Sequence, residues 1–459
     1  MVRVNCFALF AGVICLGVSG GAGNDAVLRQ FEGLMQKYRN DQAAVDALES
    51  LVLKNGDHLL QSTGPAMLTA AENAYKEMEQ NTPSLQSLPS RQKQLRKLIY
   101  QKNYIEVKQL NDNKNTDTVF NLLTPRLLWH SSERKSPKMA DLGNIANVSS
   151  SPLKVGDIEG VAAVVDYRSS GILGPVLNQE SCGGCWAFAA VGAMQAAYAK
   201  QNRMLYTLSP QQLISCDSTQ KGCQGGIYNS LWYPGGYCAN NGVTTNDLAP
   251  FQSSKGFPPT CGSLNIDVPI LRASGVVQLM SNNQNTNANM KVAVMQQPVA
   301  ISIYASCNSF MAYKSGILSL DDCNCVNNEG IDHGVLLVGY DTTGETPYWI
   351  IKNSWGPDWG MEGYAYLEIA SEDANNFNLD VGGMTVGGTC GINYNPAFPA
   401  KVTLDPYCET NDCTQYGSPV APTTSAPTSS SDSCVSRPTA TIVFAILGLI
   451  GINYQAYYC

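Results

Sequence analysis

The chain has 459 residues, of which 44 % are apolar and 14 % are charged, a composition typical of globular rather than disordered proteins. This length predicts two or three folded units. The formal net charge is −8, and the acidic excess lies beyond residue 160, which disfavours nucleic acid as a partner.

The first 20 residues have the composition of an export signal. A basic start is followed by the apolar run from Val4 to Val18 and then by small residues, and we place the cleavage near Gly20. The 16 cysteines of the chain then predict disulfide bonds in an oxidising compartment. We expect the secretory pathway, with the lysosome, the vacuole or the cell exterior as the destination.

Residues 21–160 form a first part that is mostly helical, because apolar residues recur at helical spacing along it. From about residue 161 the chain becomes rich in Gly, Cys, Trp and Tyr. We expect a helical half (about 161–270) and a β half (about 271–404), which together predict an α+β fold with a cleft between the halves. The expected helices and strands of this part are 186–203, 209–216, 289–297, 299–304, 334–340, 348–352 and 363–369.

The last part of the chain predicts a stalk and a hydrophobic tail. Residues 405–439 contain Cys408 and Cys413, followed by a Pro-, Thr- and Ser-rich stretch that is expected to stay extended. The apolar run in the tail, 440–459, is shorter than the ~18 to 20 residues that span a bilayer. Small residues, a polar spacer and a short apolar tail fit a lipid-anchor signal. A membrane-spanning tail stays open as the alternative, so the sequence predicts a membrane contact through this tail.

Cys185 is the candidate nucleophile, because it opens an alanine-rich helix with Gln179 six residues before it. A free thiol titrates near ~8.5 and a histidine-paired protease thiolate at ~3 to 4, a difference of about 6 kcal/mol. A helix end supplies at most ~2 kcal/mol, so an imidazolium must provide the rest. Of the three histidines only His333 lies beyond residue 160, which makes it the expected partner.

Three further residues complete the predicted site. The side-chain amide of Gln179 and the backbone N–H of Cys185 are suited to stabilise an oxyanion. Asn353 is suited to hold the histidine in one tautomer, as an orienting group does in a catalytic triad. Trp355 is expected to shield the Asn–His hydrogen bond from water, with a simple core tryptophan as the alternative. The combination predicts a hydrolase that uses no cofactor and no metal.

Five motifs in order, LNQESCGGCWAF, LSPQQLISCD, GCQGG, DHGVLLVGY and YWIIKNSWG, resemble the papain family of cysteine peptidases. The resemblance covers about 161–404 and implies a papain-like two-domain fold, with a helical left domain and a β-barrel right domain. It implies endopeptidase activity and assigns the catalytic roles to Gln179, Cys185, His333 and Asn353.

Three positions of the catalytic part depart from the family pattern without removing a catalytic group. Gly184 stands where Ser or Ala is usual, Glu180 where Gly is usual, and Tyr167 where Trp is common. The carboxylate of Glu180 next to Gln179 bears on pH dependence or on the leaving-group side of the cleft.

The helical first part resembles the prosegment of cathepsin L-like enzymes. The FNLLT segment at 120–124 resembles their FADLT segment, with Leu122 in place of the acidic residue, which puts a pH trigger at that position in doubt. The resemblance implies an α-helical inhibitory prosegment at 21–160 and a zymogen activated by cleavage near Gly160. The positions that resemble the family's interrupted ERFNIN motif are Gln92, Arg96, Tyr100, Asn103, Val107 and Asn111.

The resemblance also implies disulfide pairs, a substrate pocket and partners. It pairs Cys182 with Cys223, Cys216 with Cys261 and Cys390 with Cys325, with Cys323 as the alternative; we further expect Cys307 with Cys323 and Cys408 with Cys413. Substrate binding is assigned to Gly225, Gly226, Ile227, Tyr228, Ser302, Ile331, Gly334 and Asn395. Apolar walls predict Leu, Val or Phe at the second residue upstream of the cut. The implied partners are protein or peptide substrates, the chain's own prosegment and cystatin-like inhibitors.

Two other functions stay open at this point. Cys182 and Cys185, or Cys323 and Cys325, are also residues of a thiol oxidoreductase or a metal-binding module. The chain lacks a second Cys-x-x-Cys and an obvious βαβ setting, which weighs against both. A catalytically silent binding relative is the third reading, against which stands the presence of every catalytic residue type.

Overall fold

The structure is a computed structural model of the chain. It describes residues 41–129 except 55–56 and 113–116, then 160–279, 287–323, 331–370, 379–381 and 384–421, together with Phe31, Met35, Tyr38 and the short paired strands β1 (Phe7–Leu9) and β2 (Gly12–Ile14). Contacts group Met1–Ala421 into one compact unit. The predictions about the cleavage region before Gly160 and about the tail fall outside the described residues.

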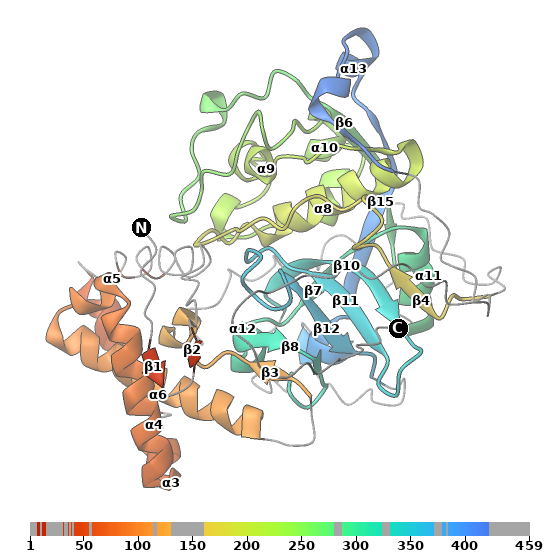
Figure 1. The fold of residues 1–459 in the computed structure, drawn as a ribbon. Helices are drawn as coiled ribbons and strands as arrows, with labels where there is room; N and C mark the ends of the chain where they lie inside the picture. The colour runs from red at the N-terminus through yellow and green to blue at the C-terminus, as the bar shows by residue number, and fades with distance from the viewer. Residues whose placement is uncertain are drawn as a thin grey trace, which may run out of the picture. The chain divides into compact units, whose positions relative to one another are not determined.

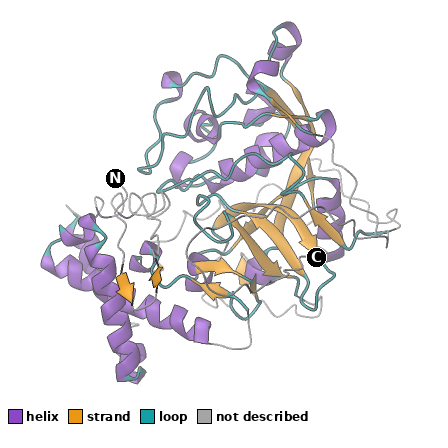
Figure 2. Cartoon of the chain, in the orientation of Figure 1, coloured by secondary structure: helices purple, strands orange, loops and turns teal. Residues whose placement is uncertain are grey.

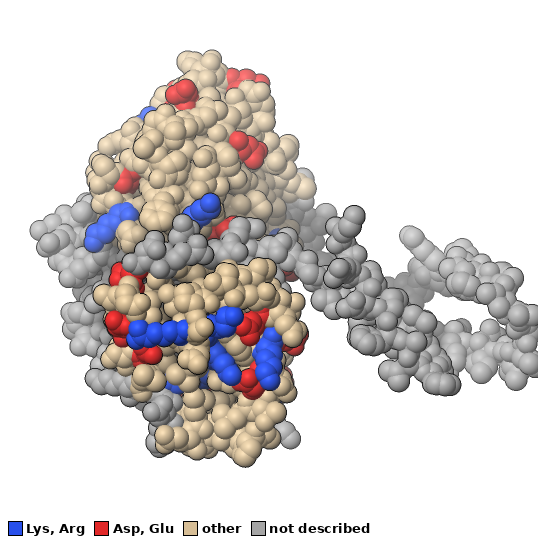
Figure 3. Space-filling view, turned by 90° about the vertical axis from the view of Figure 1, so that its left-hand side faces the viewer, with Lys and Arg blue, Asp and Glu red and all other residues tan. Residues whose placement is uncertain are grey.

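The first part of the chain is helical, as expected. Proline occupies the first turn of both α4 and α5, where its missing N–H costs nothing. Lys97 on α6 lies 2.7 Å from Glu72 on α4, and the rings of Tyr75 and Tyr100 meet edge-on 5.9 Å apart. Figure 3 shows Lys and Arg beside Asp and Glu on this face of the molecule. The helices are α2 (Gln42–Lys54), α3 (Asp57–Ser62), α4 (Pro65–Gln80), α5 (Pro83–Gln86) and α6 (Ser90–Asp112).

The helical half of the second part is organised around α8 (Cys185–Asn202), which is buried on all sides from Cys185 to Ala199. Alanine and glycine permit this close packing: a Cβ on Gly192 would lie 3.2 Å from Leu336 of the sheet. Figure 1 shows α8 between α9 (Pro210–Cys216) and the strands of the β half. Ser209 caps α9 by accepting a hydrogen bond from the N–H of Gln212, and α10 (Tyr237–Asn241) completes this half.

The β half contains an eight-stranded sheet in the described residues, with the order β6-β15-β7-β10-β11-β12-β9 and with β4 paired to β10. Figures 1 and 2 show most of these strands gathered on one side of α8, with β15 extending past the helix toward β6. The antiparallel register sets His333 opposite Ile303 and Gly334 opposite Ser302. The strands are β4 (Val164–Asp166), β6 (Leu271–Gln278), β7 (Val299–Ile303), β9 (Ile317–Leu318), β10 (His333–Asp341), β11 (Tyr348–Lys352), β12 (Tyr364–Glu368) and β15 (Tyr394–Leu404).

Several shorter elements connect these parts. Helix α11 (Asn287–Gln296) precedes β7, and α12 (Asn308–Ala312) precedes β8 (Tyr313–Ser315). Strand β8 pairs with β3 (Val119–Phe120) of the first part of the chain. The pair β13 (Leu379–Val381) and β14 (Met384–Val386) follows β12.

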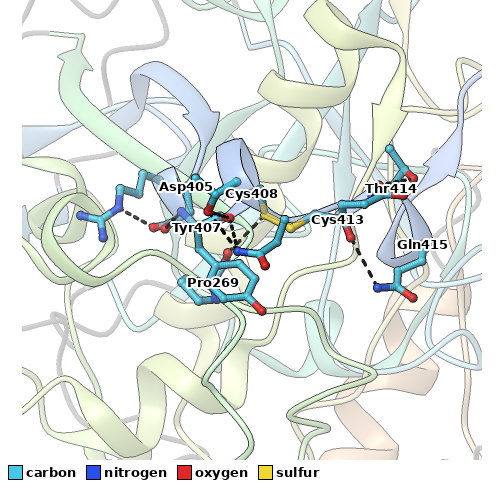
Figure 4. The surroundings of a disulfide bond; sticks show 11 residues. Pro269, Asp405, Tyr407, Cys408, Cys413, Thr414 and Gln415 are labelled. Carbon is cyan, nitrogen blue, oxygen red and sulfur yellow. Dashed lines mark hydrogen bonds and ion pairs between the residues drawn. A yellow bond between two sulfur atoms is a disulfide. The ribbon is translucent and has the colours of Figure 1, made fainter.

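The segment 405–421 folds onto the helical half, which corrects the expectation that the stalk begins at residue 405. Strand β16 (Ser418–Pro419) pairs with β5 (Met204–Leu205), and Val420 packs against Ile172 and α8. The segment also contains α13 (Pro406–Thr410) and the Cys408–Cys413 disulfide drawn in Figure 4. Asp405, only 2 % exposed, forms an ion pair with Arg272. The composition of this segment resembles that of a linker. Its fold depends on contacts with residues far away in sequence, which composition does not reveal.

Within the part of the chain that the structure describes, no helix combines the length and the apolar character that crossing a bilayer requires.

Candidate active site

Cys185 is the first residue of α8, at the end where the backbone N–H groups have no partner within the helix. It is 2 % exposed and is not part of a disulfide. Cys182 is bonded to Cys223, so the two cysteines of the motif do not pair with each other. A Cβ on Gly184 would lie 2.6 Å from the end of Ile214, so this isoleucine occupies the space that Ser or Ala would need.

The start of β10 brings His333 to the same place. A Cβ on Gly334 would lie 3.4 Å from the carbonyl oxygen of Cys185, so the first residues of β10 and α8 are in contact. Nε2 of His333 lies 2.8 Å from Oδ1 of Asn353, which follows β11. The N–H of Ser354 donates to the same Oδ1 at 2.8 Å, which identifies that atom as the amide oxygen. Nε2 is therefore the protonated nitrogen, and Nδ1 remains as the base.

Electrostatics keep the imidazole neutral in this form of the protein. Burial lowers the pKa of His333 to about 4; the hydrogen bond to Asn353 opposes this shift and the positive charge of Arg126 adds to it. His333 is 2 % exposed. An imidazolium, which a reactive thiolate needs beside it, is thus disfavoured while these surroundings persist.

Gln179 is held on both sides of its amide. Its Oε1 accepts a hydrogen bond from Oγ of Ser354 at 2.6 Å, and its Nε2 donates to the carbonyl of Cys182 at 3.0 Å. Its backbone N–H donates to the carbonyl of Ser354 at 2.8 Å. Ser354 therefore connects the amide of Gln179, the predicted oxyanion donor, to Asn353. The sequence reasoning missed this residue, and the only signal for it is its place between Asn353 and Trp355 in the motif.

Trp355 covers the histidine. The two ring centroids are 4.8 Å apart and the rings are tilted by 33°. Phe310 and Trp359 both meet Trp355 edge-on, with ring centroids 5.4 Å away, and hold it in place. The structure thus places this tryptophan against the ring of the predicted base, and its shielding of the Asn–His hydrogen bond stays a prediction.

The predicted substrate-binding positions lie on both halves. Gly225 has a φ of +107°, and a Cβ on Gly226 would overlap the ring of Trp186 at 2.6 Å, so both positions require glycine. The hydroxyl of Tyr228 lies 3.0 Å from Oγ of Ser302 and also donates to the carbonyl of Asn395. Ile331 is buried and Ile227 is half-buried. Tyr228, Ser302 and Asn395 are therefore joined by hydrogen bonds, and Ser302 lies opposite Gly334 in the β7–β10 pairing.

The disulfides differ from the expected set at one site. Cys390 is bonded to Cys323, with Cα atoms 5.3 Å apart, so the assignment of Cys390 to Cys325 is wrong. The Cys307–Cys323 pair is wrong as well, although Cys307 is disulfide-bonded. Two cysteines separated by one residue cannot be told apart from the sequence; the turn after β9 decides which one reaches Cys390. Cys216 is bonded to Cys261, and Cys408 to Cys413, as expected.

The first part of the chain reaches the site through the short helix η1 (Pro125–Leu128). Arg96 donates to the carbonyl of Leu128 at 3.0 Å, and the amide of Asn103 donates to the carbonyls of Leu127 and Trp129 at 2.8 and 2.9 Å. These two residues of α6 fix the segment that follows it. Arg96 and Asn103, which the sequence matched only to a motif, thus hold the backbone of 127–129 through hydrogen bonds.

The first part of the chain also docks on the β half, at α12 and at the strands that follow it. Asn308 of α12 donates to Oδ1 of Asn103 at 3.1 Å and to the carboxylate of Glu106. Thr118 donates to the carbonyl of Ile317 at 2.6 Å, next to the β3–β8 pairing.

The described residues contain no group of three or more His, Cys, Asp or Glu side chains that could hold a metal ion.

The fold and the site define a cysteine protease of the papain type. Residues 161–399 match the model of the papain family of cysteine proteases, and the chain belongs to this family.

The chain is similar to curated cysteine proteases over part of its length. Cysteine proteinase B of Leishmania mexicana is 40 % identical over 208 residues, which cover 45 % of each chain. Thiol protease SEN102 of Hemerocallis sp. is 31 % identical over 283 residues, which cover 61 % of this chain and 69 % of the relative. The chain thus spans about half the length of the first of these relatives.

Solved proforms share the fold of both parts of the chain. The proform of the Amb a 11 cysteine protease of ragweed pollen is 23 % identical and has a TM-score of 0.55, over 73 % of this chain and 95 % of that one. Digestive procathepsin L 3 of Tenebrio molitor is 24 % identical with a TM-score of 0.54, over 72 % and 99 % of the two chains. The fold is therefore papain-like with a helical prosegment.

Proposed function

We propose that the protein is a cysteine-type endopeptidase that is made as a zymogen. The observation that carries this proposal is the fixed Asn353–His333 hydrogen bond, with the buried Cys185 beside it at a helix start. These groups supply the base, its orienting partner and the nucleophile of acyl transfer.

In the proposed reaction, Nδ1 of His333 takes the thiol proton and the sulfur of Cys185 attacks the peptide carbonyl carbon. The oxyanion accepts hydrogen bonds from the Gln179 amide and from the Cys185 N–H. His333 then gives its proton to the leaving amine as the C–N bond breaks. Water, deprotonated by the same imidazole, hydrolyses the thioester and restores the thiol. Loss of one oxyanion donor is expected to lower kcat by ~100-fold or more.

For specificity, we propose Leu, Val or Phe at the second residue upstream of the cut. Ile227 and Ile331 supply apolar surface, and the hydroxyls of Tyr228 and Ser302 are satisfied by each other. Gly225 and Gly226 are buried in the zymogen and have no side chain, and we propose that a peptide lies along their backbone as an added strand once the prosegment has left.

The prosegment is proposed to act as an inhibitor until it is cut near Gly160. Its contacts with α12, β8 and Trp355 support this role. We also propose export through the secretory pathway and attachment of the tail to a membrane. Release of the protein from intact cells by a phospholipase would support a lipid anchor, whereas retention would favour a spanning tail or a protein that has lost it.

The activity is tested by expressing residues 21–421, allowing the prosegment to be cleaved, and assaying a fluorogenic Leu-Arg peptide at acid pH. We expect hydrolysis that an alkylating epoxide abolishes and that Cys185→Ala removes. Hydrolysis that survives in Cys185→Ala would overturn the mechanism, and loss of activity on chelation alone would point to a metal. A folded protein with no activity toward any peptide would indicate a silent relative.

A further inference from the structure

Arg126 in η1 is an unusual residue of the prosegment. It is 3 % exposed, Nη2 has no hydrogen-bond partner, and no described carboxylate lies within ion-pair distance. Burial lowers the pKa of its guanidinium to about 10, so the group is still charged at neutral pH. A buried charge of this kind needs compensation.

The compensation comes from Trp355. The guanidinium carbon of Arg126 lies 5.0 Å from the centroid of this ring, within the range of a cation–π contact. Phe310 and Trp359 hold the ring edge-on, so its position is set by the β half and not by the arginine. A ring that is already ordered binds a cation with little further loss of conformational freedom.

Trp355 lies on the leaving-group side of the site. His333, whose ring is 4.8 Å from Trp355, gives its proton to the leaving amine in the proposed reaction. Trp355 follows β11 and is not among the positions proposed for the upstream residues, which lie on both halves. A substrate residue just downstream of the cut would lie next to His333, and hence near the tryptophan.

We propose that the face of Trp355 that Arg126 occupies in the zymogen binds a basic side chain of the substrate, at the first or second residue downstream of the cut. Cleavage near Gly160 removes Arg126 together with the prosegment and opens the ring. The exposed carboxylate of Asp358, on the same turn as Trp355, adds a favourable charge. This inference rests on the proposed function and specifies the substrate of that site.

The test uses pairs of internally quenched peptides that differ only at one downstream position, Arg in one and the neutral isostere citrulline in the other. We expect kcat/KM to be about two- to fivefold higher for Arg, the effect of one exposed cation–π contact. In Trp355→Leu the ratio should fall to about one. The ratio cancels the general loss of activity that this substitution causes beside His333. Trp355→Phe, which keeps an aromatic face, should give an intermediate ratio if the leucine variant does not fold.

A matched pair of peptides carries the same exchange four residues upstream of the cut, where the ratio should be about one in every variant. A downstream ratio of one in the wild type, or a ratio that persists in Trp355→Leu, would overturn the inference and leave the proposed function standing. A ratio above one at both positions would indicate general attraction to an acidic protein and would also overturn it. No cleavage of any peptide would instead refute the proposed function.

Discussion

Acidification is expected to lower the free energy of unfolding of the zymogen, because His333 becomes protonated. Burial lowers the pKa of this histidine from 6.5 to about 4 in the folded zymogen. Between these values the unfolded chain binds a proton that the folded chain does not, so the stability from this group is complete above pH 6.5 and is lost as the pH falls toward 4. At 1.36 kcal/mol per pKa unit, the full loss is about 3 kcal/mol, of which ~2 kcal/mol is lost by pH 5.

The measurement is the free energy of unfolding in urea at pH 7 and at pH 5. Cys185→Ala prevents self-cleavage, and the same protein with His333→Gln as well is the matched control, because glutamine has no charge at either pH. Carboxylates contribute equally to both proteins. We expect Cys185→Ala to lose about 2 kcal/mol more on acidification than the double variant. Equal losses would refute the reasoning.

Protonation of His333 offers an acid trigger for activation of the zymogen at a position other than Leu122. The acidic residue of the FADLT segment is replaced by Leu122, so no carboxylate titrates there. His333 is buried while η1 and its Arg126 lie against Trp355. Protonation of His333 therefore favours states in which the prosegment has moved away and water reaches the ring.

Asn353→Ala should lower kcat/KM by roughly 10- to 100-fold, the effect of one hydrogen bond to a charged group, in peptide hydrolysis by the activated enzyme. Asn103→Ala removes the hydrogen bonds to the carbonyls of Leu127 and Trp129 and should destabilise the zymogen in urea by ~2 kcal/mol or more. Asn81→Ala, at an exposed helix end, should change the free energy of unfolding by no more than ~0.5 kcal/mol. A chain that ends at residue 404 should have a melting temperature several degrees below that of a chain that ends at 421. The chain that ends at 421 lacks only the tail and should melt at the same temperature as the full chain. Equal melting temperatures for the chains that end at 404 and 421 would contradict the folded role of 405–421.

Much of the catalytic part could be predicted because its patterns are local and continuous. The expected strand 348–352 is β11 itself, and the expected helix 186–203 differs from α8 by one residue at each end. Gln179 and Cys185 could be named because each role requires a particular residue type at a particular place in a motif. The geometry then adds which atoms meet, such as Oδ1 of Asn353 with Nε2 of His333.

What could not be predicted depends on contacts between distant segments. Arg126 lies in a stretch of mixed polarity, where arginine usually faces solvent, and only the docking of η1 buries it over Trp355. Ser354 shows no pattern of its own, because its role is to join two side chains that the sequence separates. The fold of 405–421 depends on Arg272 and β5, and neither has a sequence signal that points to the C-terminal segment.

The charge and the burial of Arg126 have separate effects, one on the pKa of His333 and the other on the stability of the zymogen. The charge helps to lower the pKa of His333, whereas the buried guanidinium has an unpaired Nη2 and so contributes little net stability. In the Cys185→Ala background, Arg126→Met should change the free energy of unfolding at pH 7 by less than ~1 kcal/mol. It should raise the pKa of His333 and so reduce the loss between pH 7 and pH 5, while Arg126→Lys keeps the charge and should retain the loss. An unchanged loss in Arg126→Met would show that burial alone sets the pKa and that the prosegment acts on His333 only by excluding water.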